Sequence, residues 1–512
     1  MRTWFEPSIR NIGFGYESRE KAKESGLKWF PTNKGGSYRK WYGNLELVVD
    51  WQNDGQRIRN FKDANGKLRS RPQNLKECFS DGITWTVICN HSSFRYSPIG
   101  MLYNNKGPIL GHRQSESNFY VLGYLNSKVA EYILQILSPT LGFESGYVSN
   151  LPYAADTESD AMIFNVVESC IGESKMDWDS FETSWDFKKH PLLRNVSTIS
   201  EAFAQWQAEC DDRFNKLKAN EEELNRIFID IYGLLDELTP EVEDKDVTVR
   251  KADLQRDIKS LLSYAVGCMF GRYSLDVEGL AYAGGEWDSS KYQSYIPDAD
   301  NVIPITDEEY LDDDIVSRLC AWLKAVYGAD TLEANLDYIA KALGNKGSTS
   351  REIIRNYFLN DFFRDHCQTY SVTGSGKRPI YWLFDSGKQN GFKALVYLHR
   401  YTPDTIGNLR IDYLHKMQRV YESEINRMQD MMDHSGNARE VAAASKRKDK
   451  LAKQLKECRE YDEKISHLAL SRIELDLDDG VKVNYRKLQT AQDGKFYEVL
   501  ADNKNIMVKE KK

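Results

Sequence analysis

Residues 61–70 read FKDANGKLRS, and this stretch indicates that the N-terminal part of the chain contains strands. Its central Asn65-Gly66 pair is typical of the tight turn that joins two antiparallel strands, because both residue types tolerate positive φ angles. Just upstream, NLELVVDW (44–51) has the apolar, β-branched composition of a strand. We therefore predict a mixed strand-and-helix domain over residues 1–155.

Helical periodicity follows this domain. The stretch FYVLGYLNSKVAEYILQIL (119–137) places apolar residues three or four apart, which predicts one helix that Pro139 stops. The same spacing predicts a long helix at about 199–238, ended by Pro240.

The C-terminal half contains a second hairpin pattern and a pair of helices. RPIYWLFDSGKQNGFKALVYLHRY (378–401) predicts two strands around a glycine-containing turn. Two helices are predicted at about 411–434 and 437–470, and their short joint implies an antiparallel hairpin.

These patterns define an α+β, mixed fold class. An α/β domain is followed by a helix-rich C-terminal domain with long helices and an antiparallel helical hairpin. The predicted organisation is an N-terminal domain (1–155), a connector (156–198), a long helical spacer (199–240), a helix-rich α/β domain (241–410), the helical hairpin (411–472) and a C-terminal tail (473–512).

Composition narrows the class of protein. The 512 residues are 41% hydrophobic and 12% aromatic, as in folded proteins. No run of eighteen apolar residues or signal-peptide core occurs, so we expect no membrane span and no secretion. The eight scattered cysteines fit reduced thiols in a cytoplasm. A net charge of -8 argues against indiscriminate coating of nucleic acid but allows a local basic groove.

Several short motifs resemble catalytic signatures but lack essential residues. TGSGKR (373–378) has Arg378 where a phosphate loop needs Ser or Thr. SNLPY (149–153) has Leu151 where the Asn-Pro-Pro-Tyr turn of adenine methyltransferases needs its first Pro. No HxxxH pair or G-x-S-x-G elbow occurs, and EDK (243–245) lies in a charged linker, which does not support a nuclease. We find no complete catalytic centre.

A cluster of cations surrounds the first hairpin. Lys67, Arg69 and Arg71 alternate, so in a strand they would share one face, and Lys62 would join them if the loop has two or four residues. Gln73 and Asn74 follow, with side-chain amides of the type that reads adenine.

A second group of basic residues lies upstream, where NKGGSYRKWYGN (33–44) sets Lys34, Arg39 and Lys40 among aromatics and glycines. On an acidic chain such clusters favour a nucleic-acid backbone over an ordinary solvated surface. The basic run SKRKDKLAKQLK (445–456) is instead expected to be a solvated helix face.

Longer blocks of sequence resemble a known family. KWFPTNKGGSYRKWYGN (28–44), NGKLRSRPQN (65–74), DVTVRKADLQRDIKSLLSYAVGCMFGRYSLD (246–276) and the second hairpin are similar to the C-terminal half of the PglX family. These are adenine-specific DNA methyltransferases of BREX phage-defence systems, and related blocks occur in large type II restriction-methylation enzymes. The resemblance covers nearly the whole chain.

The resemblance implies a bacterial enzyme that transfers a methyl group from S-adenosylmethionine to adenine N6. In the family, the cofactor loop and the Asn-Pro-Pro-Tyr turn belong to a catalytic domain N-terminal to these blocks, and no position here matches them. We therefore expect no catalytic, cofactor-binding or metal-binding residue in this chain, which alone would not be catalytic.

The implied role is target recognition in the cytoplasm. The implied partners are double-stranded DNA, a catalytic methyltransferase half and other BREX proteins, with no membrane. The candidate DNA-binding residues are Lys34, Arg39, Lys40, Arg57, Arg59, Lys62, Lys67, Arg69, Arg71, Gln73 and Asn74, with Arg378, Lys388 and Asn390 at the second hairpin.

Two alternatives stay open. The chain could be an interaction protein whose helical hairpin docks other defence-system components, or it could be catalytic through a motif not recognised here.

Overall fold

The computed structural model describes residues 1–70, 72–111, 115–138, 142–156, 158–344, 347–372 and 376–507. The chain forms two compact units, each with its own packing. Unit 1 contains Met1–Trp4, Ile9–Pro191 and Phe203–Asp253, and unit 2 contains Phe5–Ser8, Leu192–Ala202 and Leu254–Lys512. Small antiparallel sheets and many helices occur in both, which confirms the mixed α+β class. The segments expected to be a connector and a spacer lie mostly in unit 1.

Unit 1 holds two three-stranded antiparallel sheets. One has the order β1 (Arg2–Thr3), β3 (Leu47–Asp50), β2 (Trp29–Pro31), and the other β5 (Phe94–Ser97), β4 (Gly82–Trp85), β6 (Ile109–Gly111). The predicted strand in 44–51 is β3. The helices are α1 (Arg19–Glu24), α2 (Gln52–Arg59), α3 (Ser115–Leu125), α4 (Lys128–Leu137), α5 (Ser145–Ser149), α6 (Asp160–Asp179) and α7 (Ile199–Ile231).

The main core of unit 1 joins the second sheet to the helices. Trp85 of β4 and Phe94 of β5 belong to the same buried cluster as Leu122 of α3, Leu134 of α4 and Phe228 of α7. This packing supplies the hydrophobic stabilisation that short strands cannot provide alone. Trp41, from the loop between β2 and β3, belongs to the same cluster.

The single helix predicted at 119–137 is wrong, because the structure divides it into α3 and α4. The Asn126 side chain leaves the helix and pairs with the backbone of Phe94, accepting from its N–H (3.0 Å) and donating to its carbonyl (3.0 Å). Ser127 then caps α4, its Oγ accepting from the N–H of Ala130. The predicted stop, Pro139, lies outside the described residues.

The predicted helix at 199–238 is present as α7 but ends earlier, at Ile231. Gly233 has a φ of 64° and its N–H donates to Asp230, while the N–H of Leu234 donates to Ile229. These two bonds form a Schellman motif, which satisfies the last carbonyls of the helix. Gly233, rather than Pro240, therefore ends it.

Unit 2 is mainly helical around small sheets. Its helices are α8 (Leu254–Met269), α9 (Ile315–Tyr327), α10 (Leu332–Leu343), α11 (Ser350–Asn360), α12 (Phe362–Thr369), α13 (Thr405–Asn408), α14 (His415–His434), α15 (Ala438–Ser471), α16 (Val481–Lys487) and α17 (Asn503–Ile506). Its strands are β7 (Ile303–Pro304), β8 (Ser371–Val372), β9 (Gly376–Lys377), β10 (Tyr381–Asp385) and β11 (Lys393–Tyr397). None of the helices in the described ranges is long and apolar enough to pass through a lipid bilayer.

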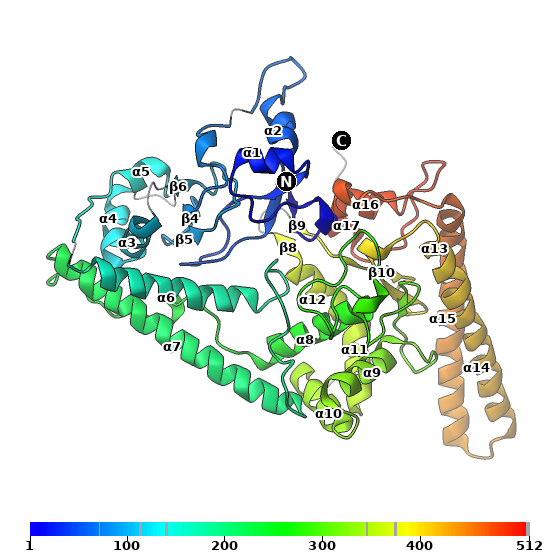
Figure 1. The fold of residues 1–512 in the computed structure, drawn as a ribbon. Coiled ribbons are helices and arrows are strands. Elements are labelled where there is room, and N and C mark those ends of the chain that lie inside the picture. The colour runs from blue at the N-terminus through cyan, green and yellow to red at the C-terminus, as the bar shows by residue number, and fades with distance from the viewer. Residues whose placement is uncertain are drawn as a thin grey trace. The chain divides into compact units, whose positions relative to one another are not determined.

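Two predictions for this half are confirmed. β10 and β11 pair antiparallel with Leu383 opposite Leu395, as the second hairpin pattern requires. α14 and α15 run side by side (Figure 1), and Met417, Tyr421 and Met428 of α14 are buried. The apolar residues of α15 that recur at helical spacing are buried as well: Leu451, Leu455, Cys458, Tyr461, Ile465 and Leu468.

Candidate nucleic-acid interface

The first hairpin is present, with the Asn65-Gly66 turn at its tip. Lys62 and Leu68 form an antiparallel bridge, and the N–H of Arg69 donates to the carbonyl of Phe61 (2.9 Å). The Asp63 carboxylate accepts from the backbone N–H groups of Asn65 (3.0 Å) and Lys67 (2.9 Å). Those bonds hold the pKa of Asp63 below its usual range. The side chain of Asp63 thus closes the turn.

The loop between Lys62 and Leu68 has five residues, 63–67. Because directly paired residues share a face, Lys62 lies on the face of Leu68, opposite to that of Lys67 and Arg69. The condition under which Lys62 would join them is therefore not met, and the hairpin carries cations on both faces. Arg71 lies outside the described residues.

The cations of the hairpin are accessible. Arg69 donates from Nε to Asp63 (2.7 Å), yet its side chain is 56% exposed. In the described part of the chain, its two terminal nitrogens have no hydrogen-bond partner. A guanidinium has five N–H donors, so this internal pair leaves donors for an incoming anion. Lys62 and Lys67 are exposed and form no ion pair within the described ranges.

Two further cations come from α2, which directly precedes the hairpin. Arg57 lies 3.5 Å from Asp50, with 83% of its side chain exposed, and Arg59 lies 2.7 Å from Asp54. Residues 53–55 have left-handed φ and ψ angles, so α2 starts with a tight turn before its helical part. The segment from Arg57 to Arg69 presents five basic residues around one loop: Arg57, Arg59, Lys62, Lys67 and Arg69.

Gln73 and Asn74 are anchored through their backbone. The Tyr103 hydroxyl donates to the carbonyls of Gln73 (3.1 Å) and Asn74 (2.5 Å), and Asn74 has a φ of 50°. Both residues are exposed, so their side-chain amides face outward from a fixed main chain. This placement suits contacts to base edges.

Arg39 has a structural role. Its guanidinium forms an ion pair with Asp177 of α6 and donates to the carbonyls of Tyr42 (2.9 Å) and Thr248 (3.3 Å). It also lies over the ring of Trp178, 5.2 Å from its centroid. Burial lowers the pKa of Arg39, while the Asp177 carboxylate opposes that shift. These contacts leave little of Arg39 for a phosphate.

Lys40 is similarly committed. Its Nζ lies 3.2 Å from Glu221 of α7, whose other oxygen accepts from the indole N–H of Trp41 (2.6 Å). Burial alone would lower the pKa of Lys40, but the Glu221 carboxylate raises it above its ordinary value. Arg39 and Lys40 therefore fix the first sheet's loop to α6 and α7. Lys34, the third cation of this group, is half-buried.

The second hairpin, in unit 2, offers fewer free groups. Arg378 pairs with Glu6 (3.3 Å) and only 16% of its side chain is exposed. Asn390 takes a φ of 54° in the turn, and its carbonyl accepts from Gln454 (3.4 Å). Lys388 is exposed.

Two sequence features rejected as sites have structural roles. SNLPY begins at Ser149, the last residue of the short helix α5, and the Tyr232 hydroxyl donates to the carbonyl of Pro152 (2.7 Å). In the basic run of α15, Arg447 pairs with Glu308 (2.6 Å) and Lys450 with Asp307 (2.6 Å). The expectation of a purely solvated helix face is therefore wrong for these two cations, which tie α15 to the segment before α9.

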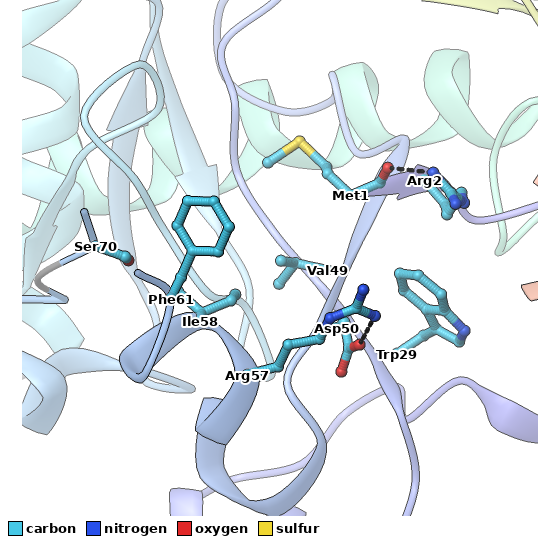
Figure 2. Close-up of a pocket in the computed structure, with 9 residues that line it drawn as sticks. All are labelled: Met1, Arg2, Trp29, Val49, Asp50, Arg57, Ile58, Phe61 and Ser70. Atoms are coloured by element: carbon cyan, nitrogen blue, oxygen red, sulfur yellow. Dashed lines mark hydrogen bonds and ion pairs between the residues drawn. The ribbon is translucent and has the colours of Figure 1, made fainter. Parts of the chain in front are cut away.

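A groove of about 420 Å³ lies beside the hairpin (Figure 2). Phe61, Ile58, Val49 and Met1 surround its apolar part, and Arg57 with Asp50 forms a polar wall. Phe61 is not among the residues predicted from the sequence to contact DNA. A signal was present, since this aromatic residue stands in a charged segment with no apolar repeat that would bury it.

Comparison with known proteins finds similarity to one class of enzyme. Over nearly its whole length the chain is similar to proteins named adenine-specific methyltransferases. It is 45% identical over 500 residues to adenine-specific methyltransferase PglX of Lacticaseibacillus casei (strain Zhang), an alignment that covers 96% of this chain and 41% of the relative. It is 34% identical over 537 residues to adenine-specific methyltransferase BrxX of Escherichia coli O9:H4 (strain HS), an alignment that covers 99% of this chain and 42% of that relative.

The chain thus spans about two fifths of the length of these relatives. No protein-family model matches the sequence.

Proposed function

We propose that this chain is the DNA-recognition portion of an adenine-specific (N6) DNA methyltransferase of a bacterial BREX anti-phage system. The observation that carries the proposal is the group of five exposed cations at Arg57–Arg69, on a chain of net charge -8. The similarity to methyltransferases named PglX and BrxX supports it. The full enzyme would use S-adenosylmethionine, bound by residues outside this chain, and would work in the cytoplasm with other BREX proteins.

The proposed mechanism separates grip from readout. The cations of α2 and the hairpin would neutralise phosphates and release condensed counterions, which supplies affinity without sequence preference. Gln73 and Asn74 would contact base edges, where an amide can form paired hydrogen bonds to adenine. Arg39 and Lys40 support this surface by holding its base, rather than by touching DNA.

Recognition would assist chemistry performed by the catalytic part. An adenine must leave the duplex before its amine can be methylated, at a cost of a few kcal/mol in lost stacking. Contacts on this chain would offset that cost at the correct site. In this proposal the chain selects where methylation occurs, and the catalytic part transfers the methyl group.

Binding to duplex DNA tests the proposal. We expect fluorescence anisotropy to show binding at about 50 mM salt that weakens steeply and linearly on a log–log scale. Absence of binding at low salt, or a flat salt response, would overturn the proposal. Calorimetric titration with S-adenosylmethionine is expected to give no heat, and a measurable heat would place cofactor binding in this chain.

The alternative of a scaffold that docks defence-system proteins makes a different prediction. It requires partners to be retained in a pull-down after nuclease treatment, together with no affinity for DNA. DNA binding that is lost on charge reversal of the hairpin would exclude it as the main role.

A further inference from the structure

Phe61 exposes its ring beside the cations of the hairpin. Phe61 is 58% exposed, and its ring makes no aromatic contact with any residue that the structure describes. Its backbone is fixed, because its N–H donates to Ile58 (3.1 Å) and its carbonyl accepts from Arg69 (2.9 Å). The segment therefore holds an aromatic face toward solvent on an ordered main chain.

Phe61 is not an isolated exposed apolar residue, because other apolar side chains lie around it. A single exposed apolar residue needs no explanation, but here Met1 and Leu68 are also exposed. Phe61, Ile58, Val49 and Met1 line one side of the groove of about 420 Å³ (Figure 2). The groove has more than enough room for a flat group such as one nucleobase.

The polar wall of the groove offers one acceptor and one donor to a ligand. The Asp50 carboxylate is an acceptor, and Arg57, 3.5 Å away, is a donor with an exposed guanidinium. Base edges present both donors and acceptors, and every base has a face that can stack on an aromatic ring. Arg69 lies on the same face of the hairpin as Phe61, where it can reach a neighbouring phosphate.

We propose that this groove binds a single unstacked base of the DNA, with the ring of Phe61 as the stacking surface. The proposal rests on the proposed function, since it takes DNA as the ligand. It adds that the chain holds the duplex in a locally opened form. A base already out of the stack is bound more tightly, because its unstacking has been achieved beforehand.

The test compares a fully paired duplex with the same duplex carrying one bulged, unpaired base. The chain is expected to bind the bulged form about tenfold more tightly, a ratio within the range of one base–aromatic stack. Phe61→Ala should reduce this ratio to about one, and Phe61→Trp should keep it. Tyr153→Ala removes a ring of equal exposure (57%) elsewhere in unit 1 and should leave the ratio unchanged.

The outcomes separate the two proposals. One outcome is that the chain binds the paired duplex with a steep salt dependence but shows no preference for the bulged form. That result would overturn the proposal that the groove binds a base and would leave the proposed function intact. A preference that persists in Phe61→Ala would also overturn the proposal for the groove. No binding to either duplex would overturn both. Since Phe61 is largely exposed, the melting temperature of Phe61→Ala should match that of the parent chain.

Discussion

Replacing Asp177 by Ala tests the structural role assigned to Arg39. Asp177 is 1% exposed on α6, pairs with Arg39, and accepts from the backbone N–H of Arg250 (3.0 Å). The variant leaves the Arg39 guanidinium buried without its carboxylate. Arginine cannot relieve this by losing its proton, because its ordinary pKa is above 12.

Removal of one partner of a buried ion pair costs about 3–5 kcal/mol. We expect Asp177→Ala to lower the free energy of unfolding of unit 1 by that amount, measured by urea denaturation followed by tryptophan fluorescence. The matched control is Arg57→Ala, which breaks an exposed pair and should cost less than about 1 kcal/mol.

The double variant Arg39→Met/Asp177→Leu distinguishes two effects: the loss of the attraction between the partners, and the cost of leaving one buried charge without a partner. Replacing both partners by apolar side chains removes the buried charges together, so this variant should be more stable than Asp177→Ala. A loss below about 1 kcal/mol for Asp177→Ala would refute the reasoning, because the pair would then resemble a surface contact.

Three further predictions concern Lys40, the amides of Gln73 and Asn74, and two buried histidines of unit 2. Lys40→Met leaves the Glu221 carboxylate without its cation and should destabilise unit 1 by about 3–5 kcal/mol. The same variant should leave the salt dependence of DNA binding unchanged. If the slope of log K against log salt became shallower by about one, Lys40 would instead contact a DNA phosphate. Gln73→Ala and Asn74→Ala should reduce discrimination between DNA sequences in competition assays without altering the salt slope, and unchanged discrimination would contradict base readout. Burial lowers the pKa of His366 and His399 to about 3. Each neutral histidine therefore makes its whole contribution to the free energy of unfolding above about pH 6.5, the pKa of the unfolded chain, and that contribution is lost as pH falls toward about 3. Urea denaturation should therefore show a loss of about 2 kcal/mol per histidine between pH 7 and pH 5, and a pH-independent free energy would contradict it.

Local features were predictable from the sequence. Both hairpins are indicated by turn residues that stand between apolar or alternating runs. The α14–α15 pair is indicated by apolar residues at helical spacing. These signals depend on residues close in the chain. What they could not give is the loop length of the first hairpin, because the Asp63 side chain decides it by accepting the turn's N–H groups.

Contacts between distant residues explain the remaining differences. Arg39 and Lys40 look like free cations in a glycine-rich stretch, but their carboxylate partners lie 138 and 181 positions away. The break between α3 and α4 depends on Asn126 meeting Phe94, a tertiary contact that helical periodicity does not show. The structure therefore buries Arg39 and Lys40 against carboxylates and leaves the cations of the hairpin and α2 exposed.

The most direct measurement is the salt dependence of duplex binding for the parent chain and for Lys67→Glu/Arg69→Glu. Each phosphate neutralised contributes about −0.9 to the slope of log K against log salt, so the variant's slope should be shallower by about two and its binding weaker. The matched control, Lys324→Glu/Lys341→Glu, reverses two exposed lysines of unit 2 and should keep the parent slope. Equal slopes for the parent and the hairpin variant would contradict the account, because the hairpin would then not touch the DNA backbone.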